Sequence, residues 1–275
     1  MNFMNKTNPI GIFDSGIGGL TVVKSVNTFL PSEKIIYFGD TARVPYGSKS
    51  NSTIIEYSIQ DAKFLAKKNV KLIIVACNTA SSVALDELRN KFDIPIIGMI
   101  NPGAKAAIKE TKNNKIGVIG TETTISNQAY SKVIKSSNPE IEVIEKACPL
   151  FVPLAEEGWI NHPATKLIAE EYLTDLKNAN IDTLILGCTH YPILKDVIQK
   201  VIGEKVKLID SGSAASVEVN EYLEGRGIKN YQHNIGKHEF YVSDVPKKFN
   251  LIAERFLGKE LEYLEKIDLE EIINV

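Results

Sequence analysis

Short apolar segments recur along the whole sequence at a spacing that few folds accommodate. Each is rich in β-branched residues and has about the length of a buried strand. Eight such segments lie at 9–13, 34–38, 71–76, 94–100, 115–120, 141–146, 183–187 and 206–210. Between most of them, apolar residues recur at helical spacing, as in 53–68, 163–177 and 212–224. This alternation predicts an α/β protein with parallel sheets covered by helices on both faces.

The length of 275 residues suggests about two domains, and a hydrophobic content of 44% is enough for two cores. The net charge of −2 gives no electrostatic reason to expect a nucleic acid or an anionic membrane as partner. The N-terminal sequence lacks the features of a signal peptide, and no stretch approaches the ~20 apolar residues of a spanning helix. The three cysteines are odd in number and none forms a C-x-x-C pair, so we expect free thiols in a reducing cytoplasm.

Two of the predicted strands end in similar sequences, LIIVACNTA and LILGCTHYP. In each, a cysteine, Cys77 or Cys188, follows the apolar run and precedes polar side chains and a helical segment. Ligands of open α/β sheets bind beyond the carboxyl ends of the strands, where a helix N-terminus also lowers the pKa of a thiol. The pair is therefore predicted to be reactive, although a single buried cysteine is more often structural. Cys148, which has no counterpart elsewhere, is interpreted as structural.

The segment FDSGIGGLTVV begins with a predicted strand end, and Asp14 and Ser15 precede a glycine-rich turn and a helix. Thr21 stands where a dinucleotide-binding fingerprint would have its third glycine, which argues against NAD binding. Two interpretations remain open. The turn forms a backbone cradle for a small anion, or Asp14 only caps the helix.

Three further features are ambiguous by themselves. Tyr46 and Gly47 lie in the polar loop 40–50, and a Tyr–Gly pair in a loop is usually only a turn. His190 follows Cys188 by two positions, where it could be structural or could orient, protonate or ligate. The charged tail 258–275 is predicted to be a surface helix that packs one face.

Taken in order, several motifs resemble those of bacterial glutamate racemases: DSGIGGLTV, PYG, ACNTAS, GVIGT, ACPLFVPL, GCTHYP and LIDSG. The resemblance extends from residue 9 to about residue 224 and is weaker in the tail. PYG alone is unspecific, but the ordered set with ACNTA and GCTHYP is highly specific. One departure is Asn127, at a position where serine is expected.

The resemblance implies two pseudo-symmetric flavodoxin-like domains with parallel sheets and an active site in the cleft between them. Residues 1–98 and 210–275 would form the first domain, and residues 99–209 the second. The implied activity is cofactor-independent racemisation of glutamate, which supplies D-glutamate for peptidoglycan. No cofactor or metal is implied, the small-molecule partner is glutamate, and a homodimer is usual in these enzymes.

The resemblance also implies the roles of individual residues. Cys77 would be the base for D-glutamate and Cys188 the base for L-glutamate, with Asp14 and His190 as their respective helpers. Two opposed bases suit the reaction because the α-proton leaves one face of the carbon and returns to the other. The implied substrate-binding residues are Asp14, Ser15, Tyr46, Gly47, Asn78, Thr79, Thr189 and His190, with Thr121 as a further contact.

Three alternatives stay open. The first is an aspartate racemase of the same superfamily, whose substrate is shorter by one methylene. The second is a zinc site, because Cys77, Cys188, His190 and Asp14 are all plausible ligands. The third is a non-catalytic amino-acid-binding or thiol-redox protein with the same fold.

Overall fold

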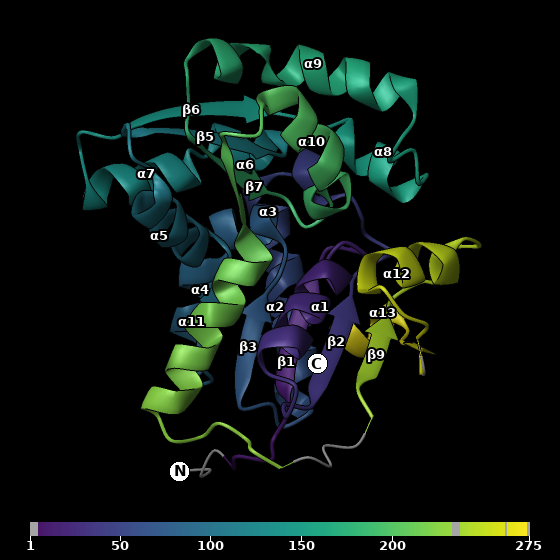
Figure 1. Ribbon diagram of the computed structural model, residues 1–275. Helices are drawn as coiled ribbons and strands as arrows, with labels where there is room; N and C mark the ends of the chain where they lie inside the picture. Colours follow the sequence, from purple (N-terminus) through teal and green to yellow (C-terminus); the bar gives the residue numbers. More distant parts are fainter. Residues whose placement is uncertain (1–4, 233–236, 262, 274–275) are drawn as a thin grey trace.

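The computed structural model describes residues 5–232, 237–261 and 263–273, which form two parallel β-sheets flanked by helices (Figure 1). The first sheet has the strand order β10–β9–β2–β1–β3–β4 and the second has the order β6–β5–β7–β8. Neighbouring strands are parallel in both sheets. The strands are β1 (Ile10–Asp14), β2 (Ile35–Gly39), β3 (Leu72–Val75), β4 (Ile96–Gly98), β5 (Lys115–Gly120), β6 (Glu142–Ala147), β7 (Thr183–Gly187), β8 (Lys207–Asp210), β9 (Glu239–Val242) and β10 (Glu265–Lys266). The predicted α/β class is confirmed, and all eight predicted strands are present.

Helices fill most of the connections between strands. They are α1 (Leu20–Phe29), α2 (Asn51–Lys67), α3 (Asn78–Val83), α4 (Leu85–Lys91), α5 (Ile100–Glu110), α6 (Glu122–Ser126), α7 (Ala129–Ser137), α8 (Phe151–Glu156), α9 (Pro163–Asn178), α10 (Lys195–Ile202), α11 (Ser211–Gly225), α12 (Phe249–Leu257) and α13 (Leu269–Ile273). Two 3₁₀ turns, η1 (Tyr46–Ser48) and η2 (Tyr191–Leu194), follow the loop after β2 and the end of β7. The N-cap of α2 is Ser50, whose hydroxyl accepts the backbone N–H of Thr53.

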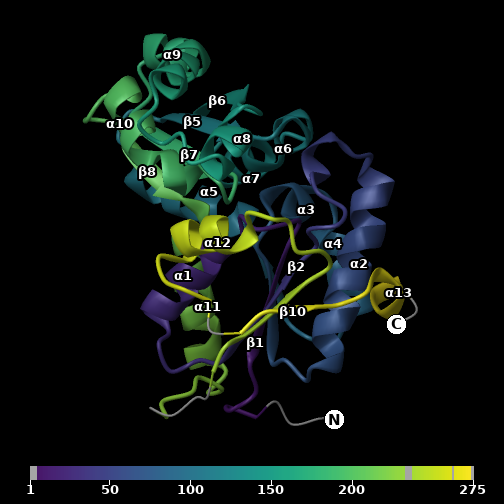
Figure 2. The ribbon, with the colours of Figure 1, turned by 90° about the vertical axis from the view of Figure 1, so that its right-hand side faces the viewer.

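Both sheets are covered on both faces, which explains why inner strands such as β1, β3 and β7 are almost continuously apolar. Figure 2 shows α1, α11 and α12 on one side of the first sheet and α2, α4 and α13 on the other. In the second sheet, Leu184 and Leu186 of β7 join the core beneath α9 and α10. Ile185, between them, joins the core beneath α5 and α7. Consecutive strand residues point to opposite faces, so an apolar side chain is needed at each position.

The chain changes sheets twice. After β4 it enters α5, which packs against β7 of the second sheet, and after β8 it enters α11, which packs against α1. The segment beyond α11 then adds β9 and β10 to the first sheet. The domain boundaries proposed from the sequence, at 98/99 and 209/210, lie close to these two changes and stay a prediction.

The C-terminal region differs from the prediction of one surface helix. Gly258, at φ +81°, follows the end of α12, and the short strand β10 pairs with β9 before the five-residue helix α13 begins. The backbone N–H of Ile267 donates to Val242 O at 2.8 Å, and its side chain is buried. The helical prediction is therefore wrong for 265–266, because pairing with a sheet edge outweighs the local preference of a charged segment. Strand β9 was also missed.

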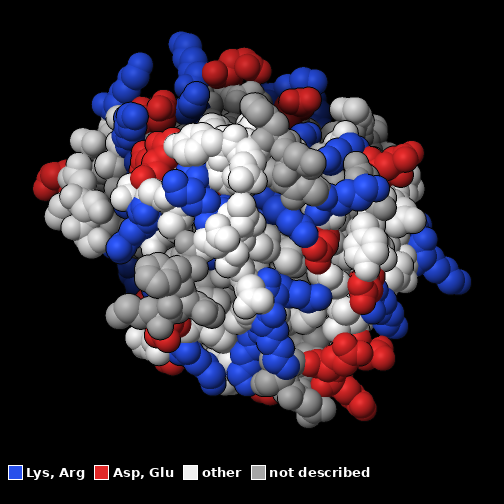
Figure 3. Space-filling model, turned by 90° about the horizontal axis from the view of Figure 1, so that it is seen from below, with Lys and Arg blue, Asp and Glu red and all other residues white. Residues whose placement is uncertain are grey.

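The molecular surface carries charges of both signs. On the face seen from below in Figure 3, lysine and arginine side chains are interspersed with aspartate and glutamate side chains, as a net charge of −2 would suggest. Within the described ranges, every helix is too short or too polar to cross a lipid bilayer.

Candidate active site

Cys77 lies beyond the carboxyl end of β3, between β1 and the edge strand β4 of the first sheet. It is the N-cap residue of α3, and its Sγ accepts the backbone N–H of Ala80 at 3.4 Å. The neighbouring strand β1 ends at Asp14, and the backbone N–H of Ala76 bonds to Phe13 O at 2.8 Å. The pairing of β1 with β3 therefore places a thiol and a carboxyl side by side at one sheet edge.

Asp14 is fully buried, and its environment is unusual for a carboxyl group. Oδ2 accepts the backbone N–H of Gly16 at 3.0 Å, whereas Oδ1 has no hydrogen-bond partner within the described residues. Burial raises the pKa of Asp14, and the nearby charge of His190 opposes this effect. The N-cap residue of α1 is Gly19, so Asp14 is not itself the N-cap residue, although its carboxyl interacts with the backbone of Gly19.

The Cys77 thiol is less acidic than its position at a helix N-terminus suggested. Burial, and then the Asp14 carboxylate, raise its pKa to about 12, although the Ser15 hydroxyl opposes the shift. α3 has only six residues, and its N-terminal field does not compensate for the desolvation of a buried thiolate. The expectation of a lowered pKa is therefore wrong for Cys77. In the resting protein this side chain is a thiol.

Cys188 follows β7 in the second sheet, and a different partner stands beside it. His190 Nδ1 lies 3.9 Å from Cys188 Sγ and 3.5 Å from Thr189 Oγ1. Its other ring nitrogen, Nε2, lies 2.9 Å from Glu156 Oε1. Burial alone would lower the pKa of His190, but the hydrogen bonds with Cys188 and Glu156 raise it to about 10. At neutral pH the imidazole ring is therefore protonated.

Glu156 is the site residue that the sequence did not reveal. It is the last residue of α8 and lies far from Cys188 in the chain, outside the motifs that carried the resemblance. No local spacing marks a glutamate in this segment as the partner of a histidine. Only the packing of α8 against η2 brings the two side chains together.

Tyr46 and Gly47 lie in η1, at the tip of the loop after β2. The Tyr46 side chain is buried, and its hydroxyl donates to Asp40 Oδ2 at 2.5 Å and lies 3.1 Å from Asp61 Oδ2. Because the hydroxyl is already engaged, we expect Tyr46 to meet a ligand through its backbone. Gly47 O accepts the Thr123 hydroxyl at 2.8 Å, so the loop reaches α6 at the second sheet.

The remaining predicted residues also join the two sheets. The hydroxyls of Thr79 and Thr121 are 2.9 Å apart, one following β3 and the other following β5. Thr189 O accepts the Thr21 hydroxyl at 2.9 Å. A Cβ atom on Gly18 would lie 2.3 Å from Thr189 Oγ1, so the glycine-rich turn packs directly against the Cys188 loop.

Asn78 is held at both ends of its amide. Its Oδ1 accepts the Tyr130 hydroxyl at 2.7 Å, and its Nδ2 donates to Ser211 Oγ at 3.2 Å. Ser15, in contrast, is half-buried, and its side chain lies close to Cys77. The structure thus gathers the predicted residues around the junction of the two sheets, where the two thiols lie close enough to interact electrostatically.

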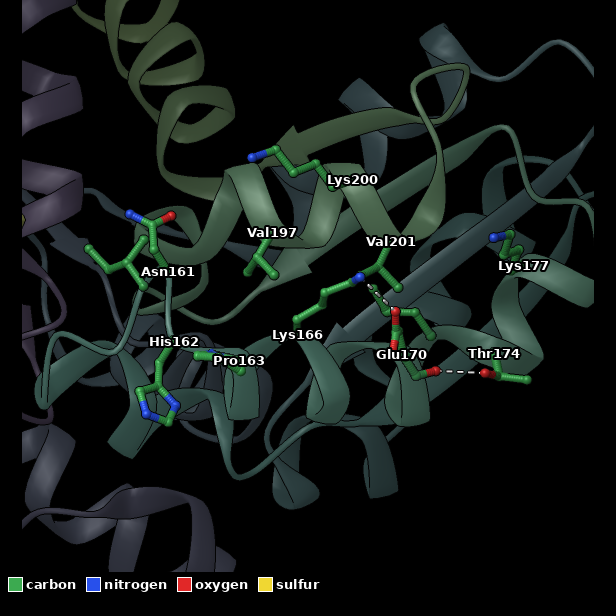
Figure 4. A pocket seen from close by; sticks show the side chains of 12 residues that line it. Asn161, His162, Pro163, Lys166, Glu170, Thr174, Lys177, Val197, Lys200 and Val201 are labelled. Carbon is green, nitrogen blue, oxygen red and sulfur yellow. Dashed lines mark hydrogen bonds and ion pairs between the residues drawn. The ribbon is translucent and has the colours of Figure 1, made fainter.

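A surface groove of about 660 Å³ lies elsewhere, between α9 and α10 (Figure 4). Its polar lining includes Lys166, Lys177 and Lys200, and Lys166 pairs with Glu170 at 3.6 Å. None of the predicted site residues lines this groove. In the described part of the chain, no three His, Cys, Asp or Glu side chains are grouped as metal ligands would be.

Comparison with known proteins agrees with this arrangement. The sequence profile of Asp/Glu/hydantoin racemases matches residues 19–219. The chain belongs to this family. It is 52% identical to the glutamate racemase of Geobacter metallireducens over 261 residues, which are 95% of this chain and 97% of the relative. It is 51% identical to the glutamate racemase of Chlorobaculum tepidum, with 97% of this chain and 98% of the relative covered.

A solved structure extends the comparison to three dimensions. The glutamate racemase of Francisella tularensis, crystallised with D-glutamate, superimposes with a TM-score of 0.91 at 44% identity. The match covers 97% of this chain and 99% of that protein. The resemblance to glutamate racemases that the motifs indicated is therefore confirmed, as is the two-sheet racemase fold.

Proposed function

We propose that this protein is a cofactor-independent glutamate racemase in which Cys77 and Cys188 exchange protons with opposite faces of the substrate. The observation that carries the proposal is that two strand-end thiols, one from each sheet, lie close enough to interact electrostatically. Each thiol lies beside its own ionisable partner. The names of the relatives support glutamate as the substrate. In this proposal the protein is a cytoplasmic homodimer. Its product, D-glutamate, is supplied for peptidoglycan synthesis.

The reaction with L-glutamate needs Cys188 as thiolate and Cys77 as thiol. The Cys188 thiolate takes the α-proton, while the Cys77 thiol gives its own proton to the opposite face of the carbon. D-Glutamate leaves, and the enzyme now has a Cys188 thiol and a Cys77 thiolate. Reaction in the opposite direction, or proton exchange with solvent, restores the starting state. The resting protonation of Cys77 matches the acid role in this direction.

The two ionisable partners suit these roles. His190, protonated at neutral pH, places a positive charge beside the Cys188 thiolate and stabilises it. Burial raises the pKa of Asp14, so this carboxyl takes up a proton more readily than an exposed one, and its protonation removes the charge that opposes a thiolate at Cys77. Asp14 is therefore able to move a proton to or from this thiol as it changes charge.

Stabilisation of the deprotonated carbon has to come from the protein, since no electron-accepting cofactor takes part. The Ser15 hydroxyl lies beside Cys77, the Thr189 hydroxyl lies 3.5 Å from His190 Nδ1, and the hydroxyls of Thr79 and Thr121 meet between the two sheets. Donors held in place before the reaction stabilise the developing charge at the substrate carboxylate without reorganising. Fixed donors of this kind also suit a substrate with two carboxylates.

The direct test is incubation of the reduced protein with L-glutamate in D₂O, with L-aspartate in a parallel reaction and without pyridoxal phosphate. We expect loss of optical rotation and deuterium at the α-carbon of glutamate only. Reaction with aspartate alone would assign the protein to aspartate instead. Absence of both reactions, with the thiols verified as reduced, would favour the non-catalytic alternative. Zinc found in protein purified without added metal would support the metal alternative.

A further inference from the structure

His190 is held by groups from several elements. Cys188 precedes it by two residues, and the Glu156 carboxylate contacts its Nε2 from α8 at 2.9 Å. The ring of Phe256, from α12, packs edge-on against the imidazole with ring centroids 5.2 Å apart. The Asp14 carboxyl interacts with it from β1 through charge. Of these groups, Glu156 fixes the direction of the ring, because it accepts the hydrogen bond at the nitrogen opposite the thiol.

The position of Glu156 cannot be secured by α8 alone. This helix has six residues, and Glu156 is the last of them. A helix of this length is marginal unless packing or side-chain contacts hold its ends. The Glu156 side chain is 35% exposed, so it is not fixed by burial either. Phe151, Leu154 and Ala155 are buried, and α8 packs against η2, so the body of the helix is placed. An outside contact at its carboxyl end would decide how firmly the Glu156 carboxylate is held.

Arg255 provides this contact. Its Nη1 donates to Ala155 O at 3.2 Å and to Glu156 O at 2.9 Å, the last carbonyls of α8. A cation there also interacts favourably with the helix dipole. Gly158, at φ +74°, leaves room for the guanidinium, since a Cβ atom at this position would lie 2.4 Å from Arg255 Nη2.

The helix that carries Arg255 is itself firmly placed. The side chains of Phe249, Ala253, Phe256 and Leu257 are buried, and α12 packs against α1 of the first sheet. Figures 1 and 2 show α12 at the junction of the two layers. One helix from the C-terminal region thus contacts His190 directly through Phe256 and holds the backbone of its partner through Arg255.

We propose that Arg255 is a positioning residue for the Cys188 half of the site, holding the end of α8 so that Glu156 meets His190. The effect of Arg255 on racemisation rests on the function proposed above. The contact between Arg255 and α8 does not depend on that function. Arg255 touches neither thiol. It acts through the backbone of α8, then through Glu156 and the imidazole.

The test compares Arg255→Met, Arg255→Lys and the control Lys248→Met in the full chain. Lys248 precedes α12 and pairs with Glu157 at 2.9 Å, but both side chains are exposed, so this pair should contribute little. Three properties are measured in each protein: racemisation of both glutamate isomers, the titration of His190 by NMR, and the rates at which iodoacetamide alkylates Cys77 and Cys188. His190→Gln assigns the NMR signal, and thermal unfolding checks the fold.

For Arg255→Met we expect kcat to fall about 10- to 100-fold with little change in KM, as for a misplaced catalytic group. The His190 titration should move down from about 10 towards its ordinary value, since it loses the Glu156 contact. Alkylation of Cys188 should slow about tenfold, because a neutral imidazole stabilises the thiolate less, while alkylation of Cys77 stays unchanged. Arg255→Lys, which keeps the charge on a shorter side chain, should be intermediate, and Lys248→Met should match the original protein.

Unchanged His190 titration and unchanged Cys188 alkylation in folded Arg255→Met would overturn the proposal, whatever the activity. If that variant does not fold, Arg255→Lys provides the test. The same His190 titration and Cys188 alkylation as in the original protein would then contradict the positioning role of Arg255. An original protein without racemase activity, in which Arg255→Met still shifts both properties, would refute the proposed function and retain the positioning role. The two proposals can therefore fail separately.

Discussion

The two halves of the site hold equivalent thiols in different ways. The ionisable partner of Cys77 comes from its own sheet, because Asp14 ends the neighbouring strand β1 and lies beside the thiol. Cys188 depends on a longer series of contacts, in which His190 bonds to Glu156 from α8. The first thiol is surrounded by acidic and apolar groups, and the second lies next to a positive charge.

This difference shows that similar sequence at two strand ends does not produce similar chemistry. LIIVACNTA and LILGCTHYP put a cysteine at the same place relative to a strand. The ionisation of each thiol is then set by residues elsewhere in the chain. An unequal pair suits racemisation, which needs one acid and one base at the start of each turnover.

Removing either thiol should produce the largest effect. Cys77→Ser and Cys188→Ser are each expected to lower racemisation by about 10²- to 10⁴-fold, because a serine hydroxyl is a far weaker base than a thiolate. The halves should be distinguishable in D₂O. Cys188→Ser is expected to exchange the α-proton of D-glutamate through Cys77, and Cys77→Ser that of L-glutamate through Cys188. Mass spectrometry of the recovered substrate measures this exchange.

A single variant that racemises at the original rate would contradict the two-base mechanism. Exchange from the wrong isomer would reverse the assignment of the two thiols. Cys148→Ser is the matched control. Its thiol is buried just beyond β6 and is not one of the predicted site residues, so the variant should keep the original activity.

Glu156→Gln should affect only the Cys188 half. Loss of the carboxylate lowers the pKa of His190, so activity at the alkaline end of the pH profile should decline at lower pH than in the original protein. A raised histidine pKa stabilises the folded state fully below the ordinary value of 6.5, and this contribution is lost as the pH rises through about 10. The stability difference between the two proteins should therefore disappear in alkaline solution. Chemical denaturation at several pH values measures it, and a constant difference would argue against a charged His190.

Gly18→Ala should disturb the contact between the halves. A Cβ atom there would lie 2.3 Å from Thr189 Oγ1 and 2.5 Å from His190 Nδ1, so the Cys188 loop has to shift. We expect about a tenfold loss in kcat/KM with a loss of stability of about 1 to 3 kcal/mol, as for overpacking. Activity and thermal unfolding are compared with Gly225→Ala, where a Cβ atom would meet no other atom within 4 Å. Equal behaviour of the two variants would show that the turn is free to move.

Sequence patterns predicted the fold well because burial on both faces leaves a clear signal. A run such as KIGVIG has few alternatives once helices must cover both sides of it. The missed strands are short: β10 has two charged residues, Glu265 and Lys266, and exists only because β9 offers an open edge. The local sequence does not indicate that an open strand edge is available for pairing.

The site was predictable where residues follow strand ends and not where distant elements meet. Cys77, Cys188 and Asp14 are marked by their positions after apolar runs. The buried environment that keeps Cys77 protonated could not be read from a helix N-terminus alone, and Glu156 has no sequence signal at all. Ionisation depends on every group that packs around a side chain, and this is a property of the folded chain.

Asp14→Asn should give the smallest change in stability and the most direct view of the Cys77 half. The fully buried carboxyl has a raised pKa and an unpartnered Oδ1, so its ionised form destabilises the fold at neutral pH. The neutral amide should stabilise the protein by about 1 kcal/mol while activity falls, as is common when a strained catalytic group is removed. Because the folded-state pKa is the higher one, the original protein should regain stability as the pH falls through it. The advantage of the variant should then shrink in thermal unfolding from neutral to acid pH. An advantage that stays constant with pH would contradict this prediction, because it would show that Asp14 does not change its protonation state over that range.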